Sequence, residues 1–190
     1  MRRLLVPISL ALVVAASAGC RQADLPVLAE APAFHLVNED GAAIDAASLE
    51  GRPWLASFLY TSCPGPCPRL VERLKLVRRT IPAGDLAFVS FTVDPATDTP
   101  DVLRKYKADH GIGTGDNWTF VTGPPSDVTT VIEHGFLTGV SSAPAGSPEG
   151  GVTHGTRVAL VDRNRHVRGF YSTEDDADLA RLERDAAAIR

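Results

Sequence analysis

The segment FLYTSCPGPCPRL, residues 58–70, places two cysteines, Cys63 and Cys67, directly after a run of apolar residues. That run, residues 53–60, shows little polar alternation, which is typical of a strand buried on both faces. Residues 68–79 follow with apolar side chains spaced by three and four, which predicts an amphipathic helix. The two thiols are therefore expected between a buried strand and the first turn of a helix. Prolines between and after the cysteines restrict the backbone of this loop.

The rest of the chain continues this alternation of strand and helix. Apolar runs predict strands, helical spacing predicts helices, and two short runs joined by a polar turn predict a hairpin. The expected elements are a strand at 86–93, a helix at 99–111, a strand at 118–123, a short helix from Ser126 to about His134, a hairpin of 157–162 and 167–172, and a helix at 175–189. A small hairpin is expected around Asp40 and Gly41. This order predicts an α/β domain with a thioredoxin-like fold, in which helices flank a central mixed β-sheet that carries an N-terminal β-hairpin extension.

Residues 1–20 have the pattern of a targeting signal. Arg2 and Arg3 precede an uncharged, mostly apolar stretch that is too short for a confident membrane span. The small residues before Cys20 resemble a bacterial lipobox, in which the cysteine is lipidated, although Ser17 stands where leucine is usual. Cleavage by ordinary signal peptidase, which would release a soluble protein, is the alternative. We expect a bacterial cell-envelope protein on the periplasmic side, anchored to the membrane as a lipoprotein through Cys20.

The mature chain is expected to consist of a flexible tether, residues 21–33, and one globular domain, residues 34–190. The sequence is 44% hydrophobic and 22% charged, which suits a single folded domain. Removal of Arg2 and Arg3 with the signal leaves 17 basic residues against 23 acidic ones, a formal net charge of −6. We therefore expect no nucleic acid among the partners.

Outside the cytoplasm, Cys63 and Cys67 could form a structural disulfide, a redox pair or a metal site. A structural disulfide is disfavoured, because a domain of this size buries its own core and a bridge across three residues closes a very short loop. A helix N-terminus stabilises a thiolate through its dipole and free amides, so we expect Cys67, and Cys63 with it, to be more acidic than ordinary cysteine. Thiolates serve disulfide exchange as well as metal binding, so both roles remain open.

A third metal ligand could come from one of five histidines. His154 differs from the others, because it ends a loop rich in Gly, Ser and Pro and directly precedes a predicted strand. In a thioredoxin-like sheet this loop faces the cysteine helix. The other four histidines have ordinary interpretations in an early strand, at helix ends or in a hairpin turn; they are His35, His110, His134 and His166.

Two classes of thiol enzyme fit the sequence less well. Thioredoxin-type reductases use a C-x-x-C motif and a cis-proline before the facing strand, whereas this chain has C-x-x-x-C and no proline in VTHGT, residues 152–156. Peroxidase-like enzymes of the peroxiredoxin type place Thr or Ser three residues before the peroxidatic cysteine. Here Tyr60 and Pro64 hold those two positions, which disfavours a peroxidase.

Four segments together resemble the Sco/SenC family: TSCPGPCP, FTVDPATDTPDVLRKY, WTFVTG and THGTRVALVD. The resemblance covers residues 30–175, and the order of C-x-x-x-C-P, D-P-x-x-D-T-P and a downstream histidine is more specific than any one of these motifs. Members of this family are thioredoxin-fold proteins of the mitochondrial inner membrane and the bacterial envelope. They bind copper and help to assemble the binuclear copper centre of cytochrome c oxidase. The resemblance thus implies a copper metallochaperone more than an enzyme.

By this resemblance Cys63, Cys67 and His154 are the copper ligands, and Asp94 lies beside the site. Two thiolates and one imidazole suit Cu(I), and sites that contain cysteine also hold Cu(II). The implied partner is the copper-bearing subunit of cytochrome c oxidase or another cuproprotein. The alternative is an envelope thiol:disulfide reductase that acts on a cuproprotein with Cys63 and Cys67 as its redox-active pair.

Three positions depart from the pattern of the family. Gly65 stands where an acidic residue is frequent, Thr97 where arginine is frequent, and Arg165 where a hairpin turn often has glycine. These differences bear on metal affinity and on the choice of partner more than on the fold.

Overall fold

The computed structural model describes residues 25–82, 84–136 and 156–189, which form one mixed sheet of eight strands with helices around it. Across the sheet the strand order is β1-β8-β7-β4-β5-β6-β2-β3. The strands are β1 (Ala29–Glu30), β2 (His35–Asn38), β3 (Ala43–Asp45), β4 (Trp54–Leu59), β5 (Ala87–Thr92), β6 (Trp118–Thr122), β7 (Arg157–Val161) and β8 (His166–Ser172).

The centre of the sheet is parallel and its margins are antiparallel. β4, β5 and β6 pair in parallel, whereas β7 and β8 on one side and β2 and β3 on the other are antiparallel to their neighbours. Every residue of β4 and β5 is buried, as expected of central strands covered on both faces. Because these two strands are parallel, the loops that follow them leave from the same edge of the sheet.

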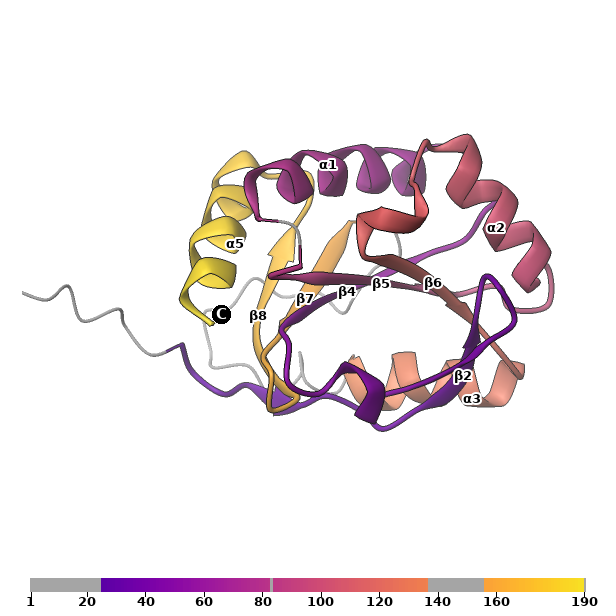
Figure 1. Cartoon of the computed structure of the whole chain (residues 1–190), viewed down its shortest axis with the longest axis horizontal. Helices are drawn as coiled ribbons and strands as arrows, with labels where there is room; N and C mark the ends of the chain where they lie inside the picture. Colours follow the sequence, from indigo (N-terminus) through magenta and orange to yellow (C-terminus); the bar gives the residue numbers. More distant parts are fainter. Residues whose placement is uncertain (1–24, 83, 137–155, 190) are drawn as a thin grey trace, which may run out of the picture.

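Helices cover both faces of the sheet (Figure 1). On one face lie α1 (Pro66–Thr80), α2 (Pro100–Asp109) and α5 (Asp176–Ala188). The other face carries α3 (Pro125–Thr129), which continues as the π-helix η3 (Thr130–Phe136). Two short 3-10 helices, η1 (Ala47–Leu49) and η2 (Thr114–Asp116), lie in connecting segments. Among the helices of the described residues, none has both the length and the apolar character needed to cross a membrane.

Local sequence explains where the helices begin and which side they bury. α1 and α2 both have a proline in the first helical positions, where no backbone N–H is needed. The Thr99 hydroxyl accepts a hydrogen bond from the Val102 N–H and caps α2. Leu70, Leu74 and Val77, which the helical spacing predicts on one side of α1, are all buried.

The predicted fold and element order are confirmed, and two hairpins show how the turns are made. β2 and β3 pair around the turn at Asp40 and Gly41, where Gly41 has a φ of 76°. The β7–β8 turn has Arg165 at a φ of 65°. A left-handed conformation costs a non-glycine residue roughly 1–2 kcal/mol.

Two expectations need correction. The tether predicted at 21–33 is folded in its last part, because Ala29 and Glu30 pair with β8 and Ala31 is only 1% exposed. The fold therefore begins before residue 34. The single helix predicted from Ser126 to about His134 is instead α3 followed by a π-helix, whose last residue, Phe136, packs against aromatic rings of β4.

Candidate functional site

The two cysteines lie at the edge of the sheet where β4 ends. Residues 60–63 form a turn, in which the Cys63 N–H donates to the Tyr60 carbonyl at 3.2 Å. α1 begins at Pro66, so Cys67 lies in its first turn, and the Cys67 N–H donates to the Cys63 sulfur at 3.3 Å. Both cysteines are free thiols and are buried, with 6% and 0% of their surface exposed. The structure thus brings together the two sulfurs that the sequence singles out.

The two thiols differ in acidity. Burial raises the pKa of Cys63, but hydrogen bonds from the Cys67 thiol, from backbone N–H groups and from the Tyr60 hydroxyl outweigh burial and bring this pKa below its ordinary value. Burial, and after it the hydrogen bond to Cys63, raise the pKa of Cys67 to about 12. Cys63 is therefore the thiol that ionises first, and Cys67 keeps its proton to a much higher pH.

The expectation of two acidic cysteines is wrong for Cys67. The position of a residue at a helix N-terminus indicates favourable amides and a favourable dipole, but it does not report how deeply the side chain is buried. Cys67 belongs to the same apolar cluster as Leu70 and Val71, the next buried residues of α1. Removal of water from a thiolate in this cluster outweighs the helix N-terminus.

The Tyr60 hydroxyl lies next to the Cys63 thiol. The Tyr60 hydroxyl has its pKa raised first by its hydrogen bond to Cys63, then by the charge of Cys63, and to a smaller extent by the charge of Asp94. Asp94 follows β5, is partly buried, and lies close enough to Tyr60 for this electrostatic effect. The sequence does not identify Tyr60 as a hydrogen-bond donor to Cys63, because an aromatic residue at the end of an apolar run is ordinary in a strand.

Asp98 is a further residue near the cysteines to which sequence analysis assigned no role. Its side chain is fully buried. Its carboxylate accepts hydrogen bonds from the Thr61 N–H at 3.1 Å and from the hydroxyls of Thr61 and Thr92, each at 2.5 Å. The second aspartate of the D-P-x-x-D-T-P motif is the only signal in the sequence, and an aspartate just before a helix is usually a solvated cap.

Two adjacent cysteine sulfurs are a donor set for a soft or borderline metal ion such as Cu(I) or Zn(II). Within the ranges 25–82, 84–136 and 156–189, no three His, Cys, Asp or Glu side chains form a group that could hold a metal ion. The predicted third ligand, His154, and the predicted lipidation site, Cys20, both lie outside the described residues. His166 is interpreted from the sequence as a residue of a hairpin turn. In the structure its Nδ1 atom lies 3.5 Å from a carboxylate oxygen of Asp162 at the β7–β8 turn, which agrees with this interpretation.

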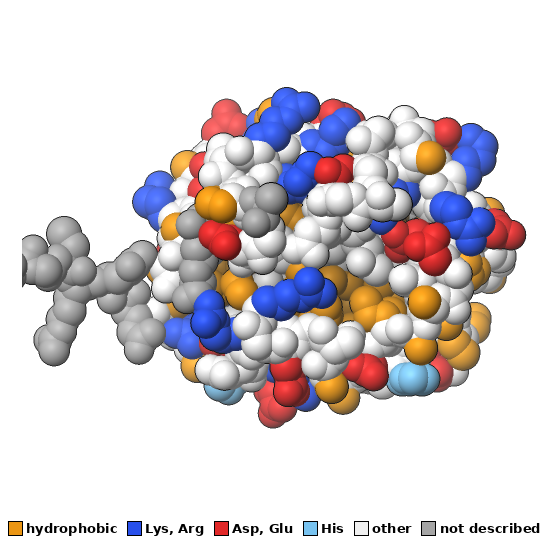
Figure 2. Space-filling model, in the orientation of Figure 1, with side chains coloured by type: hydrophobic (Ala, Val, Ile, Leu, Met, Phe, Trp, Pro, Cys, Tyr) orange, Lys and Arg blue, Asp and Glu red, His pale blue; other side chains and the backbone are white. Residues whose placement is uncertain are grey.

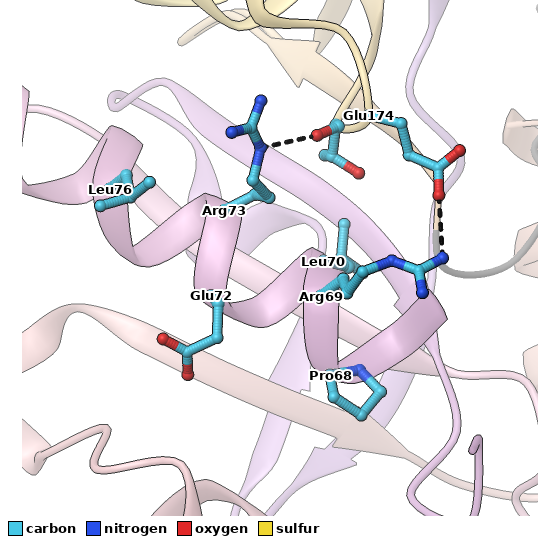
Figure 3. A pocket seen from close by; sticks show the side chains of 8 residues that line it. Pro68, Arg69, Leu70, Glu72, Arg73, Leu76 and Glu174 are labelled. Atoms are coloured by element: carbon cyan, nitrogen blue, oxygen red, sulfur yellow. Dashed lines mark hydrogen bonds and ion pairs between the residues drawn. The ribbon is translucent and has the colours of Figure 1, made fainter. Parts of the chain in front are cut away.

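A groove of about 520 Å³ runs along the outer side of α1 and begins at Pro68, directly after the second cysteine (Figure 3). Leu76, which is 49% exposed, lies at the other end of the residues that line it. Arg69 pairs with Glu174 at 3.2 Å, and the Arg73 guanidinium donates to the carbonyl just before Glu174 at 3.0 Å. Among the described residues that line this groove there is no cysteine and no histidine.

Charges of both signs are mixed on the molecular face shown in Figure 2. Acidic and basic side chains alternate along its margin, and hydrophobic side chains gather near its centre. Such alternation gives this face no strong field of a single sign to steer a charged partner.

Comparison with known proteins identifies relatives over most of the chain. The SCO1/SenC family model matches residues 23–186. The SCO1 protein homolog of Bacillus subtilis (strain 168) is 35% identical over 107 residues, which are 55% of this chain and 55% of that protein, so the match spans about half the length of that relative. The crystal structure of a SCO1/SenC family lipoprotein from Bacillus anthracis has a TM-score of 0.72 and 28% identity, and the match covers 86% of this chain and 96% of that chain.

Two further structures extend this comparison. BsSco, described as a member of the Sco family of cytochrome c oxidase assembly proteins, has a TM-score of 0.68 and 27% identity, and the match covers 85% of this chain and 93% of that chain. Yeast Sco1 with copper bound shares the fold, with a TM-score of 0.65 at 20% identity over 84% of this chain and 93% of that chain. The family match includes both cysteines, the D-P-x-x-D-T-P segment and His154, and so spans every predicted ligand. The chain therefore belongs to the SCO1/SenC family.

Proposed function

We propose that this protein binds copper through Cys63, Cys67 and His154 and delivers it to the copper centre of cytochrome c oxidase or of another cuproprotein. The observation that carries the proposal is the pair of buried, free thiols that lie side by side at the edge of the sheet. Thiolate ligands select soft or borderline metal ions, Cu(I) among them. The copper bound in yeast Sco1 and the role in oxidase assembly stated for BsSco support this choice of metal and recipient.

His154 is proposed as the third ligand from its place in the chain. β7 runs antiparallel to β4 with Val158 opposite Ser57, so the start of β7 lies beside the end of β4 from which the cysteine turn leaves. Just before β7, the Thr156 carbonyl accepts hydrogen bonds from the N–H and the hydroxyl of Thr173. His154 is two residues from Thr156, and two residues of chain span at most about 7 Å. This short connection supports His154 as a ligand at the edge of the sheet where the two thiols lie.

The unequal acidity of the thiols suits a carrier that has to release its cargo. Cys63 has the lowered pKa, so it offers a thiolate to the incoming ion first. Cys67 has to lose a proton with a pKa of about 12 before it becomes a ligand, so copper uptake at neutral pH releases that proton. Return of a proton to Cys67 removes one ligand, which favours transfer of the ion to a recipient.

A thiol:disulfide reductase is the second candidate, and the same asymmetry favours it. The Cys63 thiolate would attack a disulfide of the substrate, which breaks that disulfide, joins Cys63 to one substrate sulfur as a mixed disulfide and releases the other substrate sulfur as a thiolate. The Cys67 thiol would then lose its proton and attack the Cys63 sulfur, which releases the reduced substrate thiolate and leaves a Cys63–Cys67 disulfide. The disulfide switch described for BsSco supports such chemistry in a relative.

For the location we propose a lipid anchor on Cys20 at the periplasmic side of the bacterial envelope. The relative from Bacillus anthracis is described as a lipoprotein, which supports this anchor. Because Ala29 already pairs with β8, only residues 21–28 would separate the lipid from the sheet. The anchored domain would therefore stay close to the membrane surface.

The variant His154→Ala separates the chaperone from the reductase. Loss of a direct ligand should weaken copper binding by at least about 10 to 100-fold, whereas disulfide exchange should be nearly unchanged because it depends on Cys63 and Cys67. Both properties can be measured on the purified, reduced protein, with His166→Ala as the matched control. Oxidase copper content is then compared between strains with equal levels of each variant. Normal oxidase copper in the His154→Ala strain would contradict copper delivery through His154 and favour the reductase.

A further inference from the structure

A buried carboxylate connects the cysteine turn to the loop that follows β5. The Asp98 side chain has none of its surface exposed. One carboxylate oxygen accepts from the Thr61 hydroxyl at 2.5 Å, and the other accepts from the Thr61 N–H at 3.1 Å and from the Thr92 hydroxyl at 2.5 Å. A buried charge is costly unless donors satisfy it, so Asp98 holds these three donors firmly.

One end of this connection determines where Cys63 lies. Thr61 is the second residue of the turn 60–63, and the Cys63 N–H closes that turn on the Tyr60 carbonyl. Asp98 binds both the backbone and the side chain of Thr61, so the turn cannot rotate without breaking two hydrogen bonds. The position of the Cys63 sulfur therefore follows from the position of Asp98.

The other end is anchored to the sheet and to α2. Thr92 is the last residue of β5 and lies opposite Leu59, the last residue of β4. Its hydroxyl also accepts from the Asp94 N–H at 3.0 Å, and the Asp94 carbonyl accepts from the Asp98 N–H at 2.9 Å. Thr99, the next residue, caps α2. Asp98 is thus fixed by two rigid elements before it touches the cysteine turn.

We propose that Asp98 is a positioning residue, which holds the cysteine turn through Thr61 and Thr92 so that the Cys63 sulfur already faces Cys67 before copper arrives. This inference rests on the proposed copper-binding function. Because both of its oxygens are engaged within the protein, Asp98 acts through Thr61 and is not a ligand. A turn ordered in advance spares the site the entropy of ordering two thiols during binding.

The variant Thr61→Val tests this proposal with little disturbance of the fold. Valine keeps the shape of threonine and the backbone hydrogen bond to Asp98, and it removes only the hydroxyl donor. Copper affinity of the reduced protein should fall about tenfold, and the sulfur-to-copper charge-transfer band of the Cu(II)-loaded protein should shift or weaken. Asp98→Asn should cause a larger loss, because the charge that attracts all three donors is removed. Thr97→Val is the matched control, since Thr97 lies in the same loop with an exposed side chain.

Thermal unfolding of each variant separates positioning from general stability. Equal copper affinity and equal charge-transfer bands for Thr61→Val and Thr97→Val would overturn the proposal. A loss of copper affinity that is fully accounted for by the fraction of unfolded protein would also overturn it. If the wild-type protein takes up no copper, the proposed function fails. The role of Asp98 is then tested by the equilibrium constant for forming the Cys63–Cys67 disulfide against glutathione. A constant that changes in Thr61→Val and not in Thr97→Val supports positioning by Asp98. Equal constants in these two variants exclude it.

Discussion

The charged groups on the inner side of α1 are buried, whereas those on its outer side are exposed to water. At the inner N-terminal end, the buried Cys67 shares its surroundings with the buried, fully hydrogen-bonded carboxylate of Asp98. On the outer side, Arg69 pairs with Glu174 across the groove, with 66% and 52% of their side chains exposed. Exposed ion pairs contribute about 1 kcal/mol at most, whereas breaking a buried charge interaction costs about 3 to 5 kcal/mol. The geometry of the thiol site should therefore depend on the inner side of α1, while the groove should tolerate change.

Two leucines of α1 give the largest expected contrast between these sides. Leu74 is 1% exposed in the inner cluster, and Leu76 is 49% exposed in the groove. Leu74→Ala should lower the free energy of unfolding by about 2 to 5 kcal/mol, because it leaves a cavity in the core. Leu76→Ala should change it by about 0.5 kcal/mol or less. Urea denaturation measures both free energies, and similar losses for the two variants would contradict this difference between the two sides of α1.

Copper affinity should depend on pH because of the buried thiol of the inner side. The pKa of Cys67 is raised to about 12, so this thiol is protonated throughout pH 6 to 8 and has to release its proton to bind copper. The affinity should therefore rise with pH, by about tenfold per pH unit for this one proton. Competition with a chelator, corrected for the protonation of the chelator itself, measures the slope. A flat profile would mean that Cys67 is not a ligand or is already ionised.

The outer ion pair should give the smallest effect. Glu174→Ala removes the partner of Arg69 and should lower the free energy of unfolding by no more than about 1 kcal/mol, because both side chains are in water. Adding salt should shrink this difference further. A double-mutant cycle with Arg69→Ala isolates the pair. A coupling energy well above 1 kcal/mol would show that the groove is as tightly constrained as the inner side.

Much of the fold can be predicted because each element carries its own local pattern. The unbroken apolar runs of β4 and β5 and the spacing of Leu70, Leu74 and Val77 in α1 require no knowledge of the rest of the chain. β1 is different, since two residues have no periodicity and become a strand only through pairing with β8. The π-helix η3 also escapes prediction, because tertiary packing of Phe136 against Trp54 and Phe58 accompanies it.

Some features of the candidate site can also be predicted from local sequence, and others cannot. Cys63 and Cys67 can be found from their spacing and from their place before a helix. The acidity of Cys67 cannot, because it is set by how completely the helix and the sheet exclude water from its sulfur. The contribution of Asp98 is equally hidden, since it requires two loops that are distant in sequence to leave the sheet at one edge. His154 and Asp94 as site residues stay predictions.

X-ray absorption spectroscopy of the copper-loaded, reduced protein identifies the atoms that bind the copper ion. The proposed site predicts two sulfur ligands and one imidazole nitrogen around each copper ion. Cys67→Ser should lose one sulfur, and His154→Ala should lose the imidazole. Copper surrounded only by nitrogen and oxygen, or a spectrum that Cys67→Ser leaves unchanged, would contradict a copper site built on the cysteine turn.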